Sequence, residues 1–262
     1  MKIAGIIPAR MSSSRFPGKP LAKICGIQMV GHVLKRSKMS KLLDEVYVAT
    51  CDKEIYDYVE SIGGKAIMTS SSHERGTDRV AEATLKIEKQ MKMKLEIVVN
   101  IQGDEPMLTP EMIDDAIKPM LDDPTIVCVN LMAPLKDTEE HEDPNEVKVV
   151  VDMENFAMYF SREPIPSRKK GAKDIPMNKQ VCIIPFTRDF LIKFTNLEPT
   201  PLEIVESVDM LRAMEHGYRV KMVPTDVVTY SVVTIEDLKI VENLMADDEL
   251  LLDYSSYNLN LK

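Results

Sequence analysis

The chain has 262 residues, of which 44% are hydrophobic and 29% charged, and this balance argues against a disordered or fibrous protein. A formal net charge of −9 argues against a general nucleic-acid binder, and no apolar run approaches the roughly 18 residues of a membrane span. Four scattered cysteines without CxxC spacing argue against a zinc site or a disulfide framework, and the lack of a signal-peptide pattern predicts a cytoplasmic location.

The first half of the chain alternates short apolar runs with amphipathic segments. Strands are expected at Lys2–Pro8, Glu45–Ala49, Lys65–Met68, Glu96–Ile101 and Thr125–Leu131. Helices are expected between them, at Val30–Ser37, Lys53–Ser61, Asp78–Lys89 and Pro110–Leu121. Strands joined through helices need crossover connections, so the pattern predicts an α/β fold with a mixed, mostly parallel sheet that is flanked by helices.

A loop of small and cationic residues follows the first expected strand. It runs from Pro8 to Pro20 and contains Arg10, Arg15 and Lys19, with Ala9 and Ser14 among its small residues. Small residues let backbone N–H groups approach an anion, hydroxyls donate hydrogen bonds, and the cations neutralise its charge. The loop therefore predicts a phosphate site. The alternative is an ordinary turn with solvated cations.

This loop is not a Walker A motif. That motif needs a Gly, four residues, and then Gly-Lys-Ser/Thr. Here Pro20 follows Lys19, and Ser13 stands where the first Gly belongs. The departure disfavours an ATPase or GTPase and leaves a polyphosphate site open.

A turn rich in carboxylates, Gln102-Gly103-Asp104-Glu105-Pro106, follows the fourth expected strand. Ligands of open α/β sheets bind beyond the carboxyl ends of the strands, and Mg²⁺ on a nucleotide is commonly held by one or two carboxylates plus phosphate oxygens. Asp104 is therefore our candidate magnesium ligand, and the amide of Gln102 could read a base or a hydroxyl. The alternative is that Asp104 and Glu105 only cap the turn.

A third motif, His73–Arg79, follows the third expected strand. Gly76 permits close backbone approach, and Asp78 suits the cap of the next helix. Arg75 and Arg79 are candidates for phosphate or base contacts. A plain helix start with solvated arginines is an equally good interpretation of this motif alone.

The second half of the chain changes character. A hairpin is expected from Val147–Asp152 and Phe156–Phe160, an exposed loop over Ser167–Asn178, and a strand at Gln180–Ile184. One longer helix is expected from Pro201, with Leu202, Val205, Val208, Leu211 and Met214 on its apolar face. The remaining expected elements are a short helix at Asp189–Thr195, a strand at Arg219–Val223, a helix at Ile235–Met245 and a polar tail at Ser255–Lys262.

Three charged side chains of this half are candidates for an acceptor site. Arg162 ends the second hairpin strand and could grip a carboxylate with two hydrogen bonds. Glu203 and Glu206, three residues apart, could accept hydrogen bonds from sugar hydroxyls. The alternative for such a pair is a solvated helix face.

Taken together, these motifs resemble the 3-deoxy-manno-octulosonate cytidylyltransferases (CMP-KDO synthetases) over nearly the whole chain. The matching strings are Ile6–Arg10, Ser14–Leu21, Gly76–Arg79, Gln102–Pro106, Pro144-Asn145 with Val147–Val150, Tyr159–Arg162, and Pro201–Glu203 with Glu206 and Leu211-Arg212. The N-terminal motifs in combination are specific to cytidylyltransferases that activate sugars.

The resemblance implies a nucleotidyltransferase-type sheet with a smaller subdomain for dimerisation and the acceptor. It implies transfer of CMP from CTP to an eight-carbon acidic sugar, with Mg²⁺ as cofactor, pyrophosphate as the second product, and a place in lipopolysaccharide assembly. The predicted nucleotide-binding residues are Pro8, Ala9, Arg10, Ser14, Arg15, Lys19, Arg75, Gly76, Asp78 and Gln102. The predicted catalytic residues are Arg15, Lys19 and Asp104, with Asp104 as the metal ligand, and the predicted acceptor-binding residues are Gln102, Arg162, Gln180, Glu203 and Glu206.

Three positions depart from the pattern of that family. Gln180 and Ile184 stand where the family carries a His and a Tyr that approach the sugar, and Val233 stands where it carries an Asp that ligates a second metal ion. The nucleotide half is intact while the acceptor half has diverged. The alternatives are therefore a CMP-activating enzyme for another acceptor, such as a nonulosonate or a phosphonate, and a catalytically impaired CTP-binding homologue.

We expect a single domain over residues 1–262, and a homodimer. Residues 1–135 would bind CTP, and residues 136–225 would bind the acceptor and dimerise. Residues 226–262 would return to the main part and form the tail. No residue of the sequence suggests itself as the general base.

Overall fold

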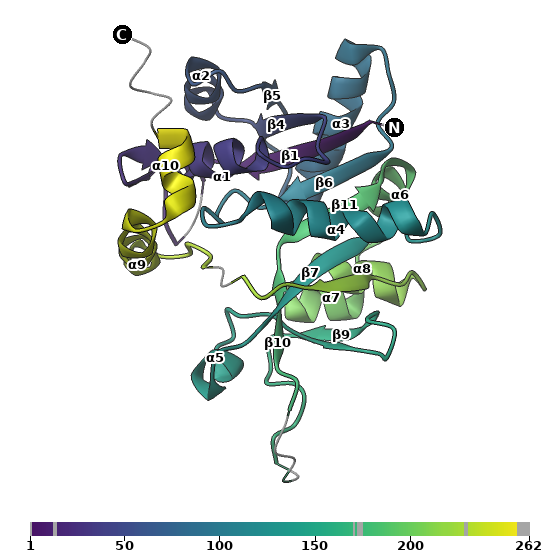
Figure 1. Cartoon of the computed structure of the whole chain (residues 1–262). Helices are drawn as coiled ribbons and strands as arrows, with labels where there is room; N and C mark the ends of the chain where they lie inside the picture. The colour runs from purple at the N-terminus through teal and green to yellow at the C-terminus, as the bar shows by residue number, and fades with distance from the viewer. Residues whose placement is uncertain (1, 13–14, 170, 172–174, 228–229, 256–262) are drawn as a thin grey trace. The chain divides into compact units, whose positions relative to one another are not determined.

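The computed structural model describes residues 2–12, 15–169, 171, 175–227 and 230–255, and the chain forms two compact units (Figure 1). The first unit comprises Met1–Leu95, Asn100–Asp114 and Thr229–Lys262, and the second comprises Glu96–Val99 and Asp115–Val228. The chain passes from the first unit to the second at residue 115 and returns to the first at residue 229. The functional division expected from the sequence, at residues 136 and 226, stays a prediction.

A sheet in the order β6-β1-β4-β5 forms the centre of the first unit, which holds the last residues of β6. Its strands are β1 (Ile3–Ala9), β4 (Glu45–Thr50), β5 (Ala66–Met68) and β6 (Ile97–Ile101). β1 runs parallel to β4, and β4 runs parallel to β5. Every residue of β1 is buried, as expected for an apolar strand that is covered on both faces.

Helices connect these strands as the crossover pattern predicts. They are α1 (Met29–Ser37), α2 (Lys53–Ser61), α3 (Gly76–Met91) and the start of α4 (Pro110–Asp122). Right-handed crossovers in this strand order place α1 and α2 on one face of the sheet and α3 on the other. The bounds of α2 agree with the prediction, and the other three helices extend one to two residues beyond it at one or both ends.

The C-terminal segment packs against the N-terminal part of the same unit. Its helices α9 (Ile235–Ala246) and α10 (Glu249–Ser255) share a core with β2 (Lys23–Ile24), β3 (Ile27–Gln28) and the start of α1. Val232 belongs to this core and is fully buried. The core thus holds the segment before α9 close to the loop after β1.

A buried polar network fixes α10 on α1. The hydroxyl of Tyr254 donates to Nδ1 of His32 (2.8 Å) and accepts from Nε of Arg36 (3.0 Å), and Arg36 also pairs with Asp248. The other ring nitrogen of His32 donates to the carbonyl of Ile24 at 2.8 Å, so we assign the neutral tautomer. Burial lowers the pKa of His32 to about 4, and the nearby Arg36 acts in the same direction.

The second unit is built on a sheet with the order β12-β7-β10-β8-β9. Its strands are β7 (Val129–Pro134), β8 (Lys148–Val151), β9 (Ala157–Ser161), β10 (Asn178–Val181) and β12 (Lys221–Pro224). The predicted hairpin is present, because β8 and β9 pair antiparallel. The helices are the remainder of α4 (residues 115–122) and α5 (Thr138–Glu142), α6 (Arg188–Phe194), α7 (Pro201–Glu206) and α8 (Asp209–Glu215). Of these, α5 was not predicted, and α8 was predicted only as the continuation of α7.

One predicted strand is wrong in an informative way. The segment Gln180–Ile184 contains the end of β10 and the start of β11 (Ile183–Thr187), which belong to different sheets. The chain leaves one sheet at Cys182 and continues beside the first residues of β6, where the amide of Arg188 donates to the carbonyl of Glu96 at 2.9 Å. Alternation of side chains cannot reveal such a change of sheet, because both strands keep an extended backbone.

The single long helix expected from Pro201 is also wrong. Ser207 adopts a left-handed conformation (φ 53°, ψ 47°) and ends α7, and α8 begins two residues later. The expected apolar face is partly reversed, since Val205 is 77% exposed while Glu203 is fully buried. The carboxylate of Glu203 points inward because it binds the guanidinium of Arg212. The carboxylate of Glu206 points inward because it accepts hydrogen bonds from the hydroxyls of Tyr159 and Ser161.

Some predictions fall on residues outside the described ranges. They are the role of Ser14, part of the loop over Ser167–Asn178, and most of the tail over Ser255–Lys262. Among the described residues, no helix is both long and apolar enough to cross a bilayer.

Candidate nucleotide-binding site

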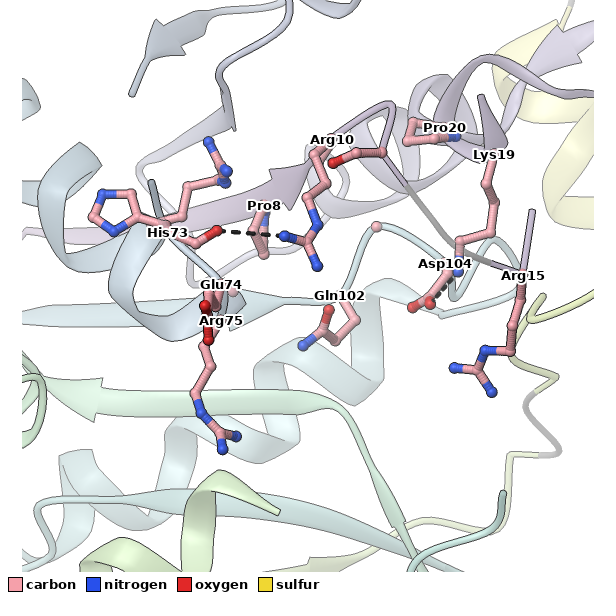
Figure 2. A pocket seen from close by; sticks show the side chains of 15 residues that line it. Pro8, Arg10, Arg15, Lys19, Pro20, His73, Glu74, Arg75, Gln102 and Asp104 are labelled. Carbon is pink, nitrogen blue, oxygen red and sulfur yellow. Dashed lines mark hydrogen bonds and ion pairs between the residues drawn. The ribbon is translucent and has the colours of Figure 1, made fainter. Parts of the chain in front are cut away.

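Three loops of the first unit meet at the carboxyl ends of β1, β5 and β6 and enclose a cavity of about 290 Å³ (Figure 2). They are the loop after β1, the segment from His73 to Arg79, and the turn Gln102–Asp104. This is the edge of the sheet at which open α/β folds bind ligands. The three motifs selected from the sequence therefore form one site.

The loop after β1 is held in its bend by backbone hydrogen bonds. Gly18 has φ 76°, a conformation that favours glycine, and its amide donates to the carbonyl of Met11 at 3.0 Å. The amide of Met11 donates in turn to the carboxylate of Asp52 at 2.7 Å. These contacts bring Lys19, at the start of η1 (Lys19–Leu21), back towards the end of β6.

Two glycines allow the loops to approach each other. A Cβ on Gly103 would lie 3.0 Å from the carbonyl oxygen of Pro8, and one on Gly76 would lie 3.3 Å from the Pro8 ring. Real Cβ atoms are rarely that close to backbone oxygen. Glycine at these positions therefore lets the ends of β1 and β6 and the start of α3 come together.

The cavity is electropositive although the chain as a whole is acidic. Five cationic side chains line it, against two acidic ones, Glu74 and Asp104. The cations are Arg10, Arg15, Lys19, Arg75 and Arg79. Such a lining attracts an anion of several charges.

Lys19 and Asp104 form an ion pair on one side of the cavity (Figure 2). The ammonium nitrogen of Lys19 lies 2.6 Å from Oδ2 of Asp104 and 2.9 Å from the carbonyl oxygen of Val232. Gln102 lies between Arg10 and Asp104 in this view. The predicted phosphate ligand and the predicted metal ligand are thus in direct contact.

His73 supplies the other wall of the cavity. Its carbonyl accepts a hydrogen bond from Arg10 (3.4 Å), and its ring contacts the carboxylate of Glu82. Burial acts to raise the pKa of Glu82, but hydrogen bonds from Lys86, the Ser70 amide and His73 outweigh it and bring that pKa to about 2. Glu82 is therefore ionised at neutral pH, and its contact with the His73 ring holds this wall of the cavity in place.

Arg79 lines the cavity from a buried position that its motif did not reveal. The residue is 2% exposed, and its Nη1 donates to Oγ1 of Thr69 (2.5 Å) and to the carbonyl of Ser70 (3.2 Å). Its Nη2 is buried without a hydrogen-bond partner among the described residues. A buried donor of this kind gains when a ligand accepts its hydrogen bond.

The carboxylates near the end of β6 differ in their availability to a metal ion. Glu105 is buried and accepts from the hydroxyl of Ser231, and Asp237 accepts from the amides of Val233 and Thr234 as a helix cap. The described residues contain no cluster of three or more His, Cys, Asp or Glu side chains suited to a metal. Asp104, whose side chain is 30% exposed, fits a Mg²⁺ ion that keeps waters and phosphate oxygens as its other ligands.

The predicted nucleotide-binding residues divide into three groups. Those that line the cavity are Pro8, Ala9, Arg10, Arg15, Lys19, Arg75, Gly76 and Gln102. Asp78 lies in the first turn of α3 and is not among the lining residues, and Ser14 lies outside the described residues. Ser12, whose hydroxyl the sequence offers as a further donor of this loop, also lines the cavity.

In the second unit, the predicted acceptor residues Arg162 and Glu206 are in contact. The carboxylate of Glu206 accepts from the hydroxyls of Ser161 (2.8 Å) and Tyr159 (3.1 Å) and from the amide of Arg162 (2.7 Å). Burial acts to raise the pKa of Glu206, but these hydrogen bonds outweigh it and lower the value. The guanidinium of Arg162 donates from Nε to the carbonyl of Glu206 and from Nη1 to that of Pro144, so only its outer end remains for an anion.

Glu203 and Gln180 are engaged within the protein. Glu203 is fully buried and forms two hydrogen bonds with the guanidinium of Arg212, at 2.6 and 2.7 Å. The amide of Gln180 donates to Oδ1 of Asn130 at 2.6 Å. Their roles towards an acceptor stay predictions, while these contacts give each of them a structural function.

The fold and the cationic cavity indicate the class of protein. The sequence model of the cytidylyltransferase family matches residues 4–223, and the chain belongs to this family of nucleotidyltransferases. The resemblance to the 3-deoxy-manno-octulosonate cytidylyltransferases, drawn from the motifs, is confirmed by the individual relatives.

Several curated relatives carry that name, two of them from Syntrophotalea carbinolica and Geotalea uraniireducens. The one from Syntrophotalea carbinolica is 43% identical over 250 residues, which cover 92% of this chain and 98% of the relative. The one from Geotalea uraniireducens is 43% identical over 255 residues, with 93% and 99% covered. Both therefore align with nearly the whole chain.

Solved structures agree with this assignment. A CMP:2-keto-3-deoxy-manno-octonic acid synthetase complexed with CTP superposes with a TM-score of 0.86 at 37% identity, covering 95% of this chain and all of the other. A 4-diphosphocytidyl-2C-methyl-D-erythritol synthase from Anaerococcus prevotii, at 16% identity, has a TM-score of 0.60 over 94% of this chain and 98% of the other. The second comparison shows the shared fold alone.

Proposed function

We propose that this protein transfers CMP from CTP to 3-deoxy-manno-octulosonate and releases pyrophosphate, in support of lipopolysaccharide assembly. The observation that carries the proposal is the cationic cavity, lined by all three nucleotide motifs within one unit. Relatives that bear the octulosonate name align with more than nine tenths of the chain, which supports the choice of acceptor.

The reaction is a displacement at phosphorus. A hydroxyl oxygen of the acceptor attacks the α-phosphorus of CTP, and the bond from that phosphorus to the bridging oxygen breaks as pyrophosphate leaves. Arg10, Arg15 and Lys19 would hold the triphosphate and neutralise the charge that builds on the leaving group. Positioning and electrostatics account for catalysis of this kind, with little covalent work for the protein.

Mg²⁺ is the proposed cofactor, and Asp104 is the residue that would hold it. The ion would supply charge stabilisation on the phosphate oxygens. Val233 has no ligand atom in its side chain, Glu105 and Asp237 do not line the cavity, and Glu74 lies apart from Asp104 in Figure 2. We therefore propose that Asp104 alone supplies the protein carboxylate, with the other positions left to water and substrate oxygens.

The test is turnover of CTP with the octulosonate acid in the presence of Mg²⁺, followed by pyrophosphate release and by mass spectrometry of the CMP-sugar. Lys19→Ala should lower turnover by about 100-fold or more, because a phosphate contact is lost in the transition state. Lys23→Ala is the matched control, since it removes the same charge from an exposed strand nearby. Absence of pyrophosphate with wild-type protein would refute the proposal.

A modified acidic sugar is the second candidate acceptor. Ile184 is buried at 4% exposure, and the amide of Gln180 is already bonded to Asn130. Neither position offers the donor that a His or a Tyr would supply. If turnover with a nonulosonate or a phosphonate exceeds that with octulosonate under the same conditions, the acceptor assignment changes while the CTP chemistry stays.

We further propose a cytoplasmic homodimer. The exposed apolar side chains Met158 on β9 and Ile204 and Val205 on α7 are 62%, 63% and 77% exposed, which suits a surface covered by a second copy. β9 is also an edge strand of its sheet. The free cysteines of the described chain suit a reducing compartment. Sedimentation of the wild type and of Val205→Glu tests the assembly.

A further inference from the structure

The ion pair between Lys19 and Asp104 joins two residues with separate proposed tasks. Lys19 would bind the triphosphate, and Asp104 would bind the metal ion. In the structure the two side chains bind each other, with 2.6 Å between Nζ and Oδ2. Their side chains are 16% and 30% exposed, so water only partly screens the attraction.

The ammonium of Lys19 is anchored on both sides. It donates to the carbonyl of Val232 at 2.9 Å, and the amide of Val232 donates to the carbonyl of Asp104 at 2.9 Å. Val232 is fully buried in the core that α9 and α10 build, so this carbonyl has a fixed place. The pair is therefore positioned by the fold and is more than a chance contact of two surface chains.

An ammonium at this distance excludes a divalent cation from the same oxygen. Mg²⁺ binds carboxylate oxygens at about 2.0–2.1 Å and needs their negative charge. Lys19 occupies that space beside Oδ2 and offsets the negative charge of the carboxylate. Glu105 and Asp237 do not line the cavity, and Glu74, its other acidic lining residue, lies apart from Asp104 in Figure 2, so we expect no second carboxylate to compensate.

We propose that Lys19 and the divalent cation exchange places on Asp104. Without nucleotide, the Lys19 ammonium occupies the carboxylate and keeps the metal affinity of the protein low. When the triphosphate binds, Lys19 moves from Asp104 to phosphate oxygens and frees the carboxylate for the metal ion on the nucleotide. This inference rests on the proposed function, since it concerns the same site.

The exchange couples the two ligands in both directions. The nucleotide raises the affinity for the metal ion, and by linkage the metal ion raises the affinity for the nucleotide by the same factor. Lys19 is paired with Asp104 and lines the same cavity as the other cations, so it is the residue through which we expect the two ligands to be coupled.

The test measures Mn²⁺ binding by electron paramagnetic resonance on protein without nucleotide. Wild-type protein should bind Mn²⁺ weakly, and Lys19→Met should bind it at least tenfold more tightly, because the carboxylate is no longer neutralised. The double variant Lys19→Met with Asp104→Asn should lose this gain. Arg10→Met is the matched control, since it removes one positive charge from the cavity but leaves Asp104 paired, and should stay within twofold of the wild type.

Equal Mn²⁺ affinities of Lys19→Met and wild type would overturn the inference, and so would an equal gain in Arg10→Met, which would show a general effect of charge. Circular dichroism verifies the fold of each variant, and Lys19→Gln replaces Lys19→Met if that variant is unstable. Calorimetry of CTP binding to wild-type protein is separate. If CTP does not bind, the proposed function fails, whereas the Mn²⁺ series decides whether Lys19 blocks Asp104.

Discussion

Charged side chains are used differently in the two units. In the first, five cations line a cavity, and the Lys19–Asp104 pair lies at its partly exposed edge. In the second, Glu203 and Arg212 are 0% and 6% exposed and bind each other through two hydrogen bonds. The Lys19–Asp104 pair, which would meet a ligand, keeps access to solvent, whereas the Glu203–Arg212 pair, which holds the fold, is buried.

Lys148 extends the comparison. Its side chain is fully buried at the start of β8, and its ammonium donates to the carbonyls of Asp143 (2.7 Å), Glu146 (2.7 Å) and Arg162 (2.5 Å). Burial lowers its pKa, and the carboxylates of Asp143 and Glu146 act against that shift. A cation surrounded by backbone carbonyls serves to fix two chain segments.

The largest effect is expected for Arg212→Met. This change leaves the Glu203 carboxylate buried without its cation, which costs about 3–5 kcal/mol of unfolding free energy. Urea unfolding followed by circular dichroism measures the loss, and calorimetry should show unchanged CTP affinity of the folded protein. The double variant with Glu203→Leu should recover part of the stability. A loss below about 1 kcal/mol would mean that the buried pair is not structural.

The second largest effect on stability is expected when the pH is lowered, because His32 in the buried network of the first unit is neutral in the folded protein. Unfolded His32 gains a proton as the pH falls below about 6.5, while the folded residue stays neutral down to a pKa of about 4. Stability from this group is therefore complete above pH 6.5 and falls by about 3 kcal/mol towards pH 4. Urea midpoints of wild type and His32→Gln across this range measure the effect. If the urea midpoints of wild type and His32→Gln change with pH in parallel, the predicted role of His32 is wrong.

Lys148→Met should cost about 2 kcal/mol, because three buried carbonyls lose their donor. Lys179→Met is the control, since Lys179 is also buried but its ammonium contacts the side chain of Glu146, at 3.0 Å. In the assay, Lys148→Met should raise the KM for the acceptor and leave the KM for CTP unchanged, because Arg162 is the residue that it positions. A rise in both KM values would argue for a general loss of structure.

The smallest effect on folding is expected in the cavity. Arg10 is exposed, and its hydrogen bond to the His73 carbonyl is long at 3.4 Å. Arg10→Met should weaken CTP binding about tenfold, as expected for one charged hydrogen bond, and change unfolding free energy by less than about 0.5 kcal/mol. Calorimetry and urea unfolding measure the two quantities. Unchanged CTP affinity would show that Arg10 does not bind the nucleotide.

Local patterns predicted the first unit well. The amphipathic period of α2 led to its observed bounds, and the apolar run of β1 is buried throughout. The three loops of the cavity were found because each follows a strand, and parallel strands bring their carboxyl ends to one edge. Neighbouring residues in the sequence were sufficient for these conclusions.

The errors arose where distant partners decide the outcome. Leu202 and Val205 were expected inside and Glu203 was not, because the basic partner Arg212 lies beyond a break that no periodicity announces. The change of sheet at Cys182 was also not predicted, because it depends on which distant strands β10 and β11 pair with. Buried charge cannot be recognised until its counter-charge is located.

The sequence by itself determined the class of fold, the three loops that line the cavity, and the family to which the chain belongs, because glycines, cations and carboxylates at short spacing carry that chemistry locally. Only the tertiary structure decided that Lys19 rests on Asp104, that Val232 anchors both, and that Glu203 is closed off by Arg212. The first pair is 85 residues apart in sequence, and contacts over such distances depend on how the whole unit packs.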